Sequence, residues 1–350
     1  MLSVEPIHGD AKYYGGEANF ETLENADGHW LGKGAVMLGL EGTVVPEVFD
    51  EMLRGHLPDG TVISRQIAGN ETNRPGMDLT FGAPKSLSIL ALLGGDTRLI
   101  DAHNEAVRLA MLEVEKSVNT RLTREGVTTT VTTGNMVAAL YTHDTNREGE
   151  MHLHSHGLLF NVTRADDDKW HALGSDTRQR SGIREQVYDM KLAYGQFYRE
   201  YLRPMVEDCG YTPVRSGPHG MYEFAEVPPD VIRAFSQRTA QIDDAVGRDA
   251  SPLSRSVAAL DTRKNKEFVE GEARREQWDK VLSDYDFDPD KTIQAARERS
   301  RSQATERGEA EAGSPARVTL TAEPALKEAI ILRRCRLSVI KKRSLPTAKS

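Results

Sequence analysis

The sequence predicts a domain of mixed α and β structure. Apolar runs alternate with turn-forming residues along positions 1–280, and no repeat period is visible there. Two stretches have the 3.6-residue period of an amphipathic helix, and three others are rich in β-branched and aromatic residues. Helices packed against a sheet would account for all of these patterns.

Each expected element follows from its local pattern. In chain order they are a strand at Asp78–Phe81, a helix beginning near Ser86, a helix at Leu99–Arg121, strands at Gly126–Thr133, Asn135–Thr142 and His152–Thr163, and a helix at Ile183–Cys209. A polar turn from Asp144 to Glu150 separates the last two strands, so we expect an antiparallel hairpin. Pro204 lacks a backbone N–H and should kink or end the last helix.

The C-terminal part of the chain has a different composition. Residues Pro228–Asp290 are charged and helix-like, and Ala295–Arg317 favours a solvated helix that changes into a linker. Residues Ile331–Ser350 contain seven basic and no acidic side chains, which is typical of a flexible end or a tail that touches DNA. We therefore expect a core at 1–230, a helical extension at 231–292, and a charged linker with a basic, flexible tail at 293–350.

Composition restricts the class of protein. The 350 residues include 45 Lys and Arg against 53 Asp and Glu, a net charge of −8. This balance disfavours a protein that coats nucleic acid non-specifically, although a local basic cleft remains compatible with it. Two cysteines, Cys209 and Cys335, are too few for a disulfide framework or a cysteine metal cage. With no apolar run of about 20 residues and no visible signal peptide, we expect a cytoplasmic globular protein.

Three alternating histidines are the strongest chemical signal. In a strand, His152, His154 and His156 share one face, and metal binding explains such a cluster most simply. Adjacent same-face residues lie about 7 Å apart and the outer pair about 13 Å apart, so only two of the three can share an ion. His143, at the end of the preceding strand, can face His154 and His156 across the hairpin. The predicted ligands are therefore His143, His154 and His156, with His152 outside the set; a histidine-rich strand without metal is the alternative.

Other candidate residues gain meaning beside this histidine set. Three imidazoles that leave coordination positions open suit a catalytic ion, either zinc, manganese, nickel or cobalt, or magnesium with help from phosphate oxygens. The Tyr13-Tyr14 pair alone favours packing, but beside a metal a phenol can attack a phosphodiester. Asp78 can orient a ligand histidine, or it is a cap or surface acid. Lys85 can approach a phosphate near the start of a helix, or it is a solvated charge.

An ordered series of short motifs indicates a family. The series consists of Tyr13-Tyr14, Trp30-Leu31-Gly32-Lys33-Gly34, Leu38-Gly39-Leu40, Leu57-Pro58-Asp59-Gly60, Arg74-Pro75-Gly76, Asp78-Leu79-Thr80-Phe81, Ala83-Pro84-Lys85-Ser86, Gly94-Gly95-Asp96, Leu99-Ile100-Asp101-Ala102-His103, His143-Asp144-Thr145, Leu153-His154-Ser155-His156 and, more weakly, Ala259-Leu260-Asp261-Thr262-Arg263-Lys264. Over residues 1–290 the chain thereby resembles the TrwC/TraI-type (MobF) relaxases of conjugative plasmids, in the histidine–hydrophobe–histidine (HUH) endonuclease superfamily. The resemblance implies an α+β fold, with an antiparallel β-sheet palm flanked by helices and a C-terminal helical extension that closes over single-stranded DNA.

The resemblance also implies an activity. It is the metal-dependent, site- and strand-specific nicking of transfer-origin DNA by tyrosine transesterification, through a 5′-phosphotyrosine intermediate that allows the strand to be rejoined. The nicking tyrosine falls on Tyr13, the ligands of one divalent ion on His143, His154 and His156, and the acid that orients a ligand and assists deprotonation of the tyrosine on Asp78.

Partners follow from the same resemblance. Arg263, Lys264 and Lys266 fall in the extension and are candidate DNA contacts together with Lys85, although a solvated helix face explains the extension residues equally well. Expected partners are single-stranded transfer-origin DNA, accessory DNA-binding proteins and a type IV secretion coupling protein. We expect a monomer in the cytoplasm of a donor bacterium that is translocated with the DNA strand.

Two departures from the family pattern leave alternatives open. Asn19-Phe20-Glu21 stands where relatives often have a further tyrosine, so strand transfer by a second tyrosine is in doubt. No helicase phosphate-binding loop occurs, and residues 325–340 look like the start of a segment that then stops, as in a fragment. The alternatives are a rolling-circle replication initiator, an origin-binding remnant that does not cleave, and a metal-dependent hydrolase that uses water.

Overall fold

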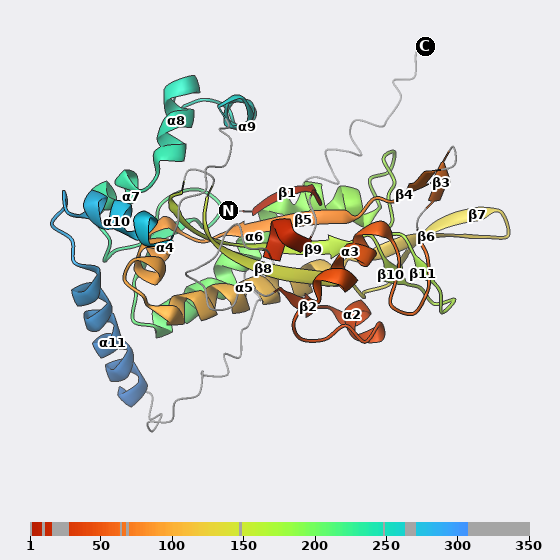
Figure 1. Cartoon of the computed structure of the whole chain (residues 1–350), viewed down its shortest axis with the longest axis horizontal. Coiled ribbons are helices and arrows are strands. Elements are labelled where there is room, and N and C mark those ends of the chain that lie inside the picture. Colours follow the sequence, from red (N-terminus) through yellow and green to blue (C-terminus); the bar gives the residue numbers. More distant parts are fainter. Residues whose placement is uncertain are drawn as a thin grey trace, which may run out of the picture.

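A five-stranded antiparallel sheet forms the centre of the molecule (Figure 1). The computed structural model describes residues 2–8, 11–15, 28–63, 65–67, 70–146, 149–247, 249–262 and 271–306. The strand order is β1 (Leu2–Pro6), β5 (Gly76–Gly82), β9 (Met151–Phe160), β8 (Ala138–Thr145) and β2 (His29–Leu31). The expected α+β fold with an antiparallel sheet is confirmed.

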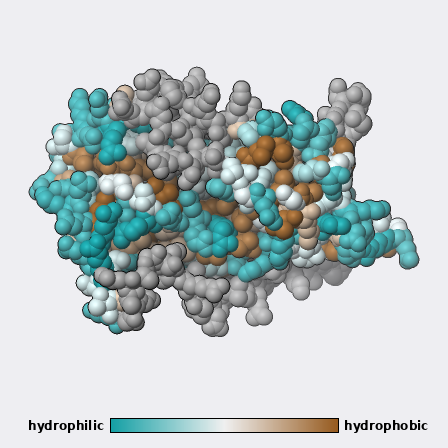
Figure 2. All heavy atoms as spheres, turned by 60° about the horizontal axis from the view of Figure 1, so that its bottom comes forward, coloured by the Kyte–Doolittle hydropathy of each residue, from teal (hydrophilic) through white to brown (hydrophobic). Residues whose placement is uncertain are grey.

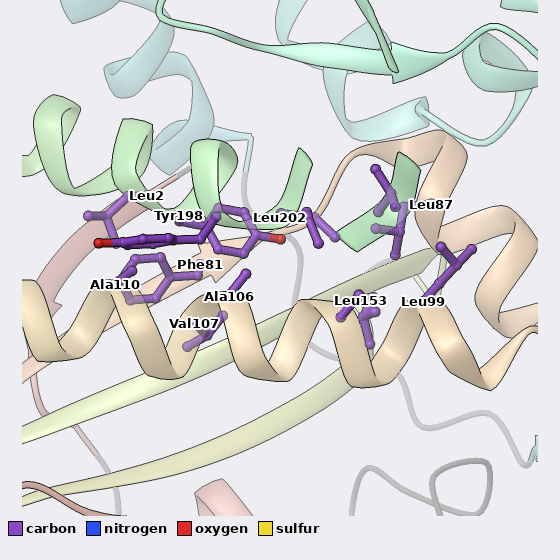
Figure 3. Packing of buried hydrophobic residues seen from close by; sticks show 14 of the residues in the cluster. Leu2, Phe81, Leu87, Leu99, Ala106, Val107, Ala110, Leu153, Tyr198 and Leu202 are labelled. Atoms are coloured by element: carbon purple, nitrogen blue, oxygen red, sulfur yellow. The ribbon is translucent and has the colours of Figure 1, made fainter. Parts of the chain in front are cut away.

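The larger hydrophobic core lies on one face of this sheet. It is covered by α4 (Lys85–Leu92), α5 (Thr97–Glu115) and α6 (Ile183–Asp208). Figure 3 shows Phe81 and Leu153 of the sheet facing α5, with Tyr198 and Leu202 of α6 beside them. Burying each such side chain contributes roughly 1.5–3 kcal/mol.

Gly157 explains how closely α5 approaches the sheet. A Cβ at this position would lie 2.7 Å from the Met111 sulfur of α5, too close for any side chain. The absence of a side chain therefore lets the middle of α5 pack directly on β9.

The opposite face of the sheet carries a smaller core. Here α1 (Ala11–Gly15), α2 (Lys33–Met37) and α3 (Pro46–Arg54) pack over β8 and β9. Phe49, Tyr14 and Phe160 are among its buried side chains. Because this core covers only part of the face, the end of β8 and the start of β9 remain available for polar groups.

Within the described residues, four two-stranded hairpins accompany the central sheet. They pair β3 (Arg65–Ile67) with β4 (Asn70–Thr72), β6 (Asn119–Arg124) with β7 (Val127–Thr132), β10 (Thr163–Arg164) with β11 (Trp170–His171), and β12 (Pro213–Arg215) with β13 (Tyr222–Phe224). In Figure 1 the β6–β7 hairpin projects from the right end of the molecule.

The C-terminal helices gather at the opposite end, around α4 (Figure 1). They are α7 (Pro229–Ala234), α8 (Gln237–Val246), α9 (Pro252–Asp261), α10 (Gly271–Leu282) and α11 (Pro289–Glu306). Trp278 of α10 and Ile293 and Ala296 of α11 are buried in the larger core. Helix α11 therefore runs through the boundary expected at residue 293, and its inner face is packed where the sequence predicts a solvated helix.

One helix is shorter than its sequence pattern predicts. The helix expected at Leu99–Arg121 ends at Glu115, and Asn119–Arg124 instead form strand β6. Asn119 pairs with Thr132, so hydrogen bonds to β7 outweigh the helical period at the end of this stretch. Helix α6 continues past Pro204 and ends at Asp208.

The described surface is largely hydrophilic on the face seen in Figure 2, with hydrophobic residues showing in separate areas. In the described part of the chain, no helix combines the length and the apolar character needed to cross a membrane.

Candidate metal centre and nucleophile

Three histidines meet at the end of the β8–β9 hairpin. His143 of β8 is paired directly with His154 of β9, and His156 follows two residues later on the same face. The ring centroids lie 5.2 Å apart for His143 and His154, 4.7 Å for His143 and His156, and 5.2 Å for His154 and His156. One nitrogen from each ring lies within 4.8 Å of the others, a geometry that a divalent ion can bridge.

His152 is not part of this group. Its ring stacks on His154 at 4.9 Å, and its carbonyl oxygen accepts a hydrogen bond from His154 Nδ1 at 2.7 Å. That bond uses Nδ1, so Nε2 is the ring nitrogen that His154 can offer to an ion. Burial, and then the neighbouring His154, lower the pKa of His152 well below its ordinary value, so the ring is neutral.

Asp78 orients the third histidine. It lies on β5 beside β9, is buried, and its Oδ2 accepts a hydrogen bond from His156 Nδ1 at 2.7 Å. The hydroxyl of Thr80 donates to the other carboxylate oxygen at 3.1 Å. With Nδ1 held by the carboxylate, Nε2 of His156 faces the other two rings, an arrangement common among histidine metal ligands.

The two adjacent tyrosines of α1 have opposite environments. Tyr13 is 44% exposed, whereas Tyr14 is 1% exposed and its ring packs edge-on against His156 at 5.4 Å. The Tyr14 hydroxyl lies 3.5 Å from Asp78 Oδ2. Burial and the negative charge of Asp78 raise the pKa of Tyr14 above its ordinary value, so this phenol keeps its proton. Tyr13 is therefore the accessible hydroxyl of the pair.

A hydrogen bond from a histidine side chain to the main chain of α1 connects this helix to the histidine cluster. His143 Nε2 donates to the carbonyl oxygen of Tyr14 at 2.9 Å. Because Tyr13 and Tyr14 are consecutive, this bond and the packing of Tyr14 hold the exposed tyrosine close to the histidine cluster.

The Lys85 ammonium group, a candidate phosphate contact, is bound within the protein. Its Nζ donates to the carbonyl of Met151 at 2.6 Å, and burial lowers its pKa. The N-terminus of α4 is also occupied, because Glu223 accepts hydrogen bonds from the backbone N–H of Lys85 and Ser86 at 3.3 and 2.8 Å. Glu223, brought in by β13 from far along the sequence, takes the place where the sequence predicts a phosphate.

The C-terminal extension packs against the rim of the site. Trp278 of α10 donates its indole N–H to the carbonyl of Gly149 at 3.0 Å, in the turn between β8 and β9. Arg274 lies 4.0 Å from Asp144, which follows His143, and both side chains are buried. These contacts were not predicted from the sequence, although a tryptophan in a highly charged helix was a visible signal. The candidate DNA contacts Arg263, Lys264 and Lys266 lie outside the described residues.

A basic groove lies beside the β6–β7 hairpin, and its lining residues do not include His143, His154 or His156. It has a volume of about 900 Å³, and Arg74, Arg121 and Arg184 are among its lining residues, together with hydroxyl and amide side chains. Guanidinium groups bind phosphate oxygens in two-pronged hydrogen bonds, so the groove has the chemistry of a nucleic-acid backbone site.

The comparisons with known proteins agree with this geometry. Residues 7–285 match the family described as TrwC relaxase. Two curated relatives, both named multifunctional conjugation protein TraI and both from Escherichia coli (one from strain K12), are 45% identical over 291 and 288 residues. Each match covers 82% of this chain and 16% of the relative, so the chain spans about a sixth of the length of these relatives.

Solved structures of the conjugative relaxase TrwC are similar throughout the core. Its metal-bound complex with oriT DNA has a TM-score of 0.72 and 30% identity, covering 83% of this chain and 100% of that one. A copper-bound complex with oriT DNA, with the same identity and coverage, has a TM-score of 0.73. A complex with a 27-mer DNA that comprises the recognition hairpin and the cleavage site has a TM-score of 0.70, 29% identity, and coverage of 83% of this chain and 100% of that one.

Proposed function

The chain belongs to the TrwC relaxase family, and from that premise we propose that it is a conjugative DNA relaxase. It would nick one strand of a transfer origin at a specific site and later rejoin it. The observation that carries the proposal is the exposed Tyr13, held on α1 beside three histidines that can share one ion. If the tyrosines served only for packing and the histidines lay on a strand that binds no metal, there would be no reason for an exposed tyrosine to be held beside three clustered histidines.

In the proposed reaction the Tyr13 hydroxyl oxygen attacks the scissile phosphorus. The phenol loses its proton to solvent as a bond forms between the phenolic oxygen and phosphorus; the bond to the 3′ oxygen breaks, and that oxygen takes up a proton from solvent. The products are a 5′-phosphotyrosine and a free 3′-hydroxyl. Because one phosphodiester replaces another, the reverse attack by the 3′-hydroxyl rejoins the strand without ATP.

Three histidines fit a divalent ion at this position. Imidazole nitrogens suit transition metals, whereas magnesium would need phosphate oxygens in addition. His143, His154 and His156 would hold the ion, which when bound would withdraw charge from the scissile phosphate. Asp78 holds the ring of His156 in place, and the buried Tyr14 packs beneath both, so we assign them supporting roles beside Tyr13.

The remaining partners are proposals from family membership. We propose that the DNA strand runs from the histidine cluster to the basic groove of Arg74, Arg121 and Arg184, and that the C-terminal extension encloses it. We also propose that the protein acts as a monomer in the donor cytoplasm. Its further partners would be accessory DNA-binding proteins and a type IV secretion coupling protein. The division into a catalytic core at 1–230, a DNA-clamping extension at 231–292 and a C-terminal linker and tail is also proposed.

The test is covalent capture of labelled DNA. The protein is incubated with single-stranded transfer-origin DNA and manganese, and the products are separated on a denaturing gel. We expect a slow-migrating protein–DNA adduct that disappears with chelator and falls by a factor of about 10³ or more in Tyr13→Phe, because no other group replaces a missing nucleophile efficiently. Tyr14→Phe is the matched control and should retain the adduct, since the Tyr14 hydroxyl is buried.

Each other outcome contradicts the proposal in a different way. An adduct that survives Tyr13→Phe and is lost in Tyr14→Phe would move the nucleophile to Tyr14. Cleaved DNA without an adduct would identify a hydrolase that uses water. Binding of a verified cognate origin without cleavage would identify a recognition protein, and cleavage of a replication origin alone would identify a rolling-circle initiator.

A further inference from the structure

A continuous chain of hydrogen bonds runs through the core directly behind the histidine cluster. The Tyr198 hydroxyl of α6 lies 2.7 Å from His103 Nδ1 on α5, and His103 Nε2 lies 2.9 Å from the Ser155 hydroxyl. The Ser155 hydroxyl lies 2.8 Å from that of Thr142, which donates to Asn104 Oδ1 at 2.7 Å. His103 is fully buried and Ser155 is 1% exposed, so these groups depend on one another for hydrogen bonds.

The terminal acceptor fixes the direction of every hydrogen bond. Asn104 Oδ1 can only accept, so the Thr142 hydroxyl donates to it and must itself accept from Ser155. Ser155 in turn accepts from His103 Nε2–H, which leaves His103 Nδ1 to accept from Tyr198. A neutral His103 satisfies this pattern, and burial does lower its pKa to about 3.

The network meets the sheet at the pair of residues that separates the ligand positions. Thr142 is paired with Ser155, between the pair His143–His154 on one side and the pair Tyr141–His156 on the other. Side chains alternate between the faces of a strand, so Thr142 and Ser155 point toward α5 where the histidines point away from it.

Consecutive residues of α5 each bind one of the two ligand-bearing strands. His103 binds Ser155 of β9, and Asn104 binds Thr142 of β8. The β8–β9 register shifts between His143 and Thr145, immediately beyond the ligand pair. Register needs to be specified at such a point, because a slip of one residue turns every side chain to the other face. The directional hydrogen bonds that join α5 to Ser155 and Thr142 add to the apolar contacts that specify it.

We propose that His103 is a positioning residue for the metal centre. Together with Asn104 it clamps β9 and β8 to α5, so that His143, His154 and His156 are held at ion-binding distance before any ion arrives. This inference rests on the proposed ligand role of the three histidines. His103 is not a ligand itself, because both of its ring nitrogens are occupied by Tyr198 and Ser155.

The experiment measures the affinity of the full chain for Mn²⁺ alone, by isothermal titration calorimetry without DNA. We expect His103→Leu to weaken binding by about tenfold or more, the effect usual for residues that orient metal ligands. His103→Gln should keep the affinity within about threefold of the unmodified protein, since an amide can both donate to Ser155 and accept from Tyr198.

Val107→Ala is the control for a general loss of stability. Val107 lies one turn further along α5, is 1% exposed and is apolar, so its truncation loosens the same helix without touching the network. We expect Val107→Ala to lower the unfolding temperature, as His103→Leu does, and to leave Mn²⁺ affinity unchanged. If Val107→Ala weakens binding as much as His103→Leu does, the effect is one of stability and the inference is wrong.

The outcomes separate this inference from the proposed function. If the unmodified protein binds no divalent ion, the proposed metal centre and this inference both fail. If it binds Mn²⁺ and folded His103→Leu binds equally well, only the inference fails. Should His103→Leu not fold, Thr142→Val and Asn104→Ala replace it, with an expected loss of severalfold each; unchanged affinity in both would overturn the inference.

Discussion

Polar side chains have different environments on the two faces of β9. On the face toward α5, Leu153, Ser155 and Leu159 are buried, and the Ser155 hydroxyl finds its partners within the protein. On the other face, His154 and His156 have one ring nitrogen held by a protein acceptor and the other directed to the histidine cluster. One face is closed by internal hydrogen bonds and packing, and the other presents a set of ligands.

This difference shows how a ten-residue strand can serve two purposes. The packed face determines where the strand lies, because its hydrogen bonds to α5 and its buried side chains together allow one arrangement between the sheet and that helix. The position of the strand in turn fixes where His154 and His156 lie on the opposite face. A functional site built on a rigid element in this way needs little further support from loops.

The sharpest test of this contrast uses neighbouring residues on opposite faces. His154→Ala removes one of three ring nitrogens and should weaken Mn²⁺ binding at least about a hundredfold, beyond the 10–100-fold typical of residues that only orient ligands. Leu153→Ala leaves a cavity and should instead lower the free energy of unfolding by roughly 2–5 kcal/mol, with metal affinity of the folded protein retained. Calorimetry and urea unfolding measure the two effects. If the two substitutions had the same effects, the faces would not be functionally separate.

A smaller effect is expected where a residue only orients a ligand on the open face. Asp78→Asn removes the negative charge that holds His156 Nδ1, and Mn²⁺ affinity should fall about 10- to 100-fold. Thr80→Ala is the matched comparison: it removes a neutral hydroxyl that contacts Asp78 Oδ1 at 3.1 Å and His156 Nδ1 at 3.3 Å but leaves the carboxylate in place, so affinity should change by less than about threefold. Equal Mn²⁺ affinity in Asp78→Asn and the unmodified protein would show that His156 keeps its orientation without the carboxylate.

A separate effect concerns the packed face and the dependence of its stability on pH. The pKa of His103 falls from an ordinary 6.5 to about 3 in the folded protein because the ring is buried. The unfolded chain therefore takes up a proton below pH 6.5 that the folded protein does not, and stability is lost as pH falls from 6.5 toward 3. The extra slope approaches about 1.4 kcal/mol per pH unit.

This slope can be isolated by comparison with His103→Gln, which has no titrating group at the position. Urea unfolding of both proteins with chelator, at several values between pH 4 and 8, should give stability curves that are parallel above pH 6.5 and diverge below it. Curves that stay parallel down to pH 4 would mean that the buried ring takes up its proton without unfolding.

Much of the site could be predicted from local sequence patterns. Alternation along His152–His156 and the polar turn before it were enough to indicate a hairpin with histidines on one face, and the structure pairs His143 with His154 as that reasoning requires. The helix at Ile183 begins where expected because its period is regular. The prediction that the helix reaches Arg121 was wrong at the C-terminal end of the helix. Asn119 pairs with Thr132 of β7, and the helical period of residues 99–121 gives no sign of this pairing.

The sequence by itself determined which residues share a strand face and therefore which histidines can meet, because side-chain direction depends only on the position in the strand. Tertiary structure alone decided that Tyr13 is exposed and Tyr14 buried, that Glu223 occupies the start of α4 beside Lys85, and that α5 clamps Ser155 and Thr142. Burial and hydrogen bonding depend on groups that lie tens of residues or more apart along the chain. A local sequence pattern does not show which distant groups will lie beside a residue in the folded protein, so burial and hydrogen bonding are known only from the tertiary structure.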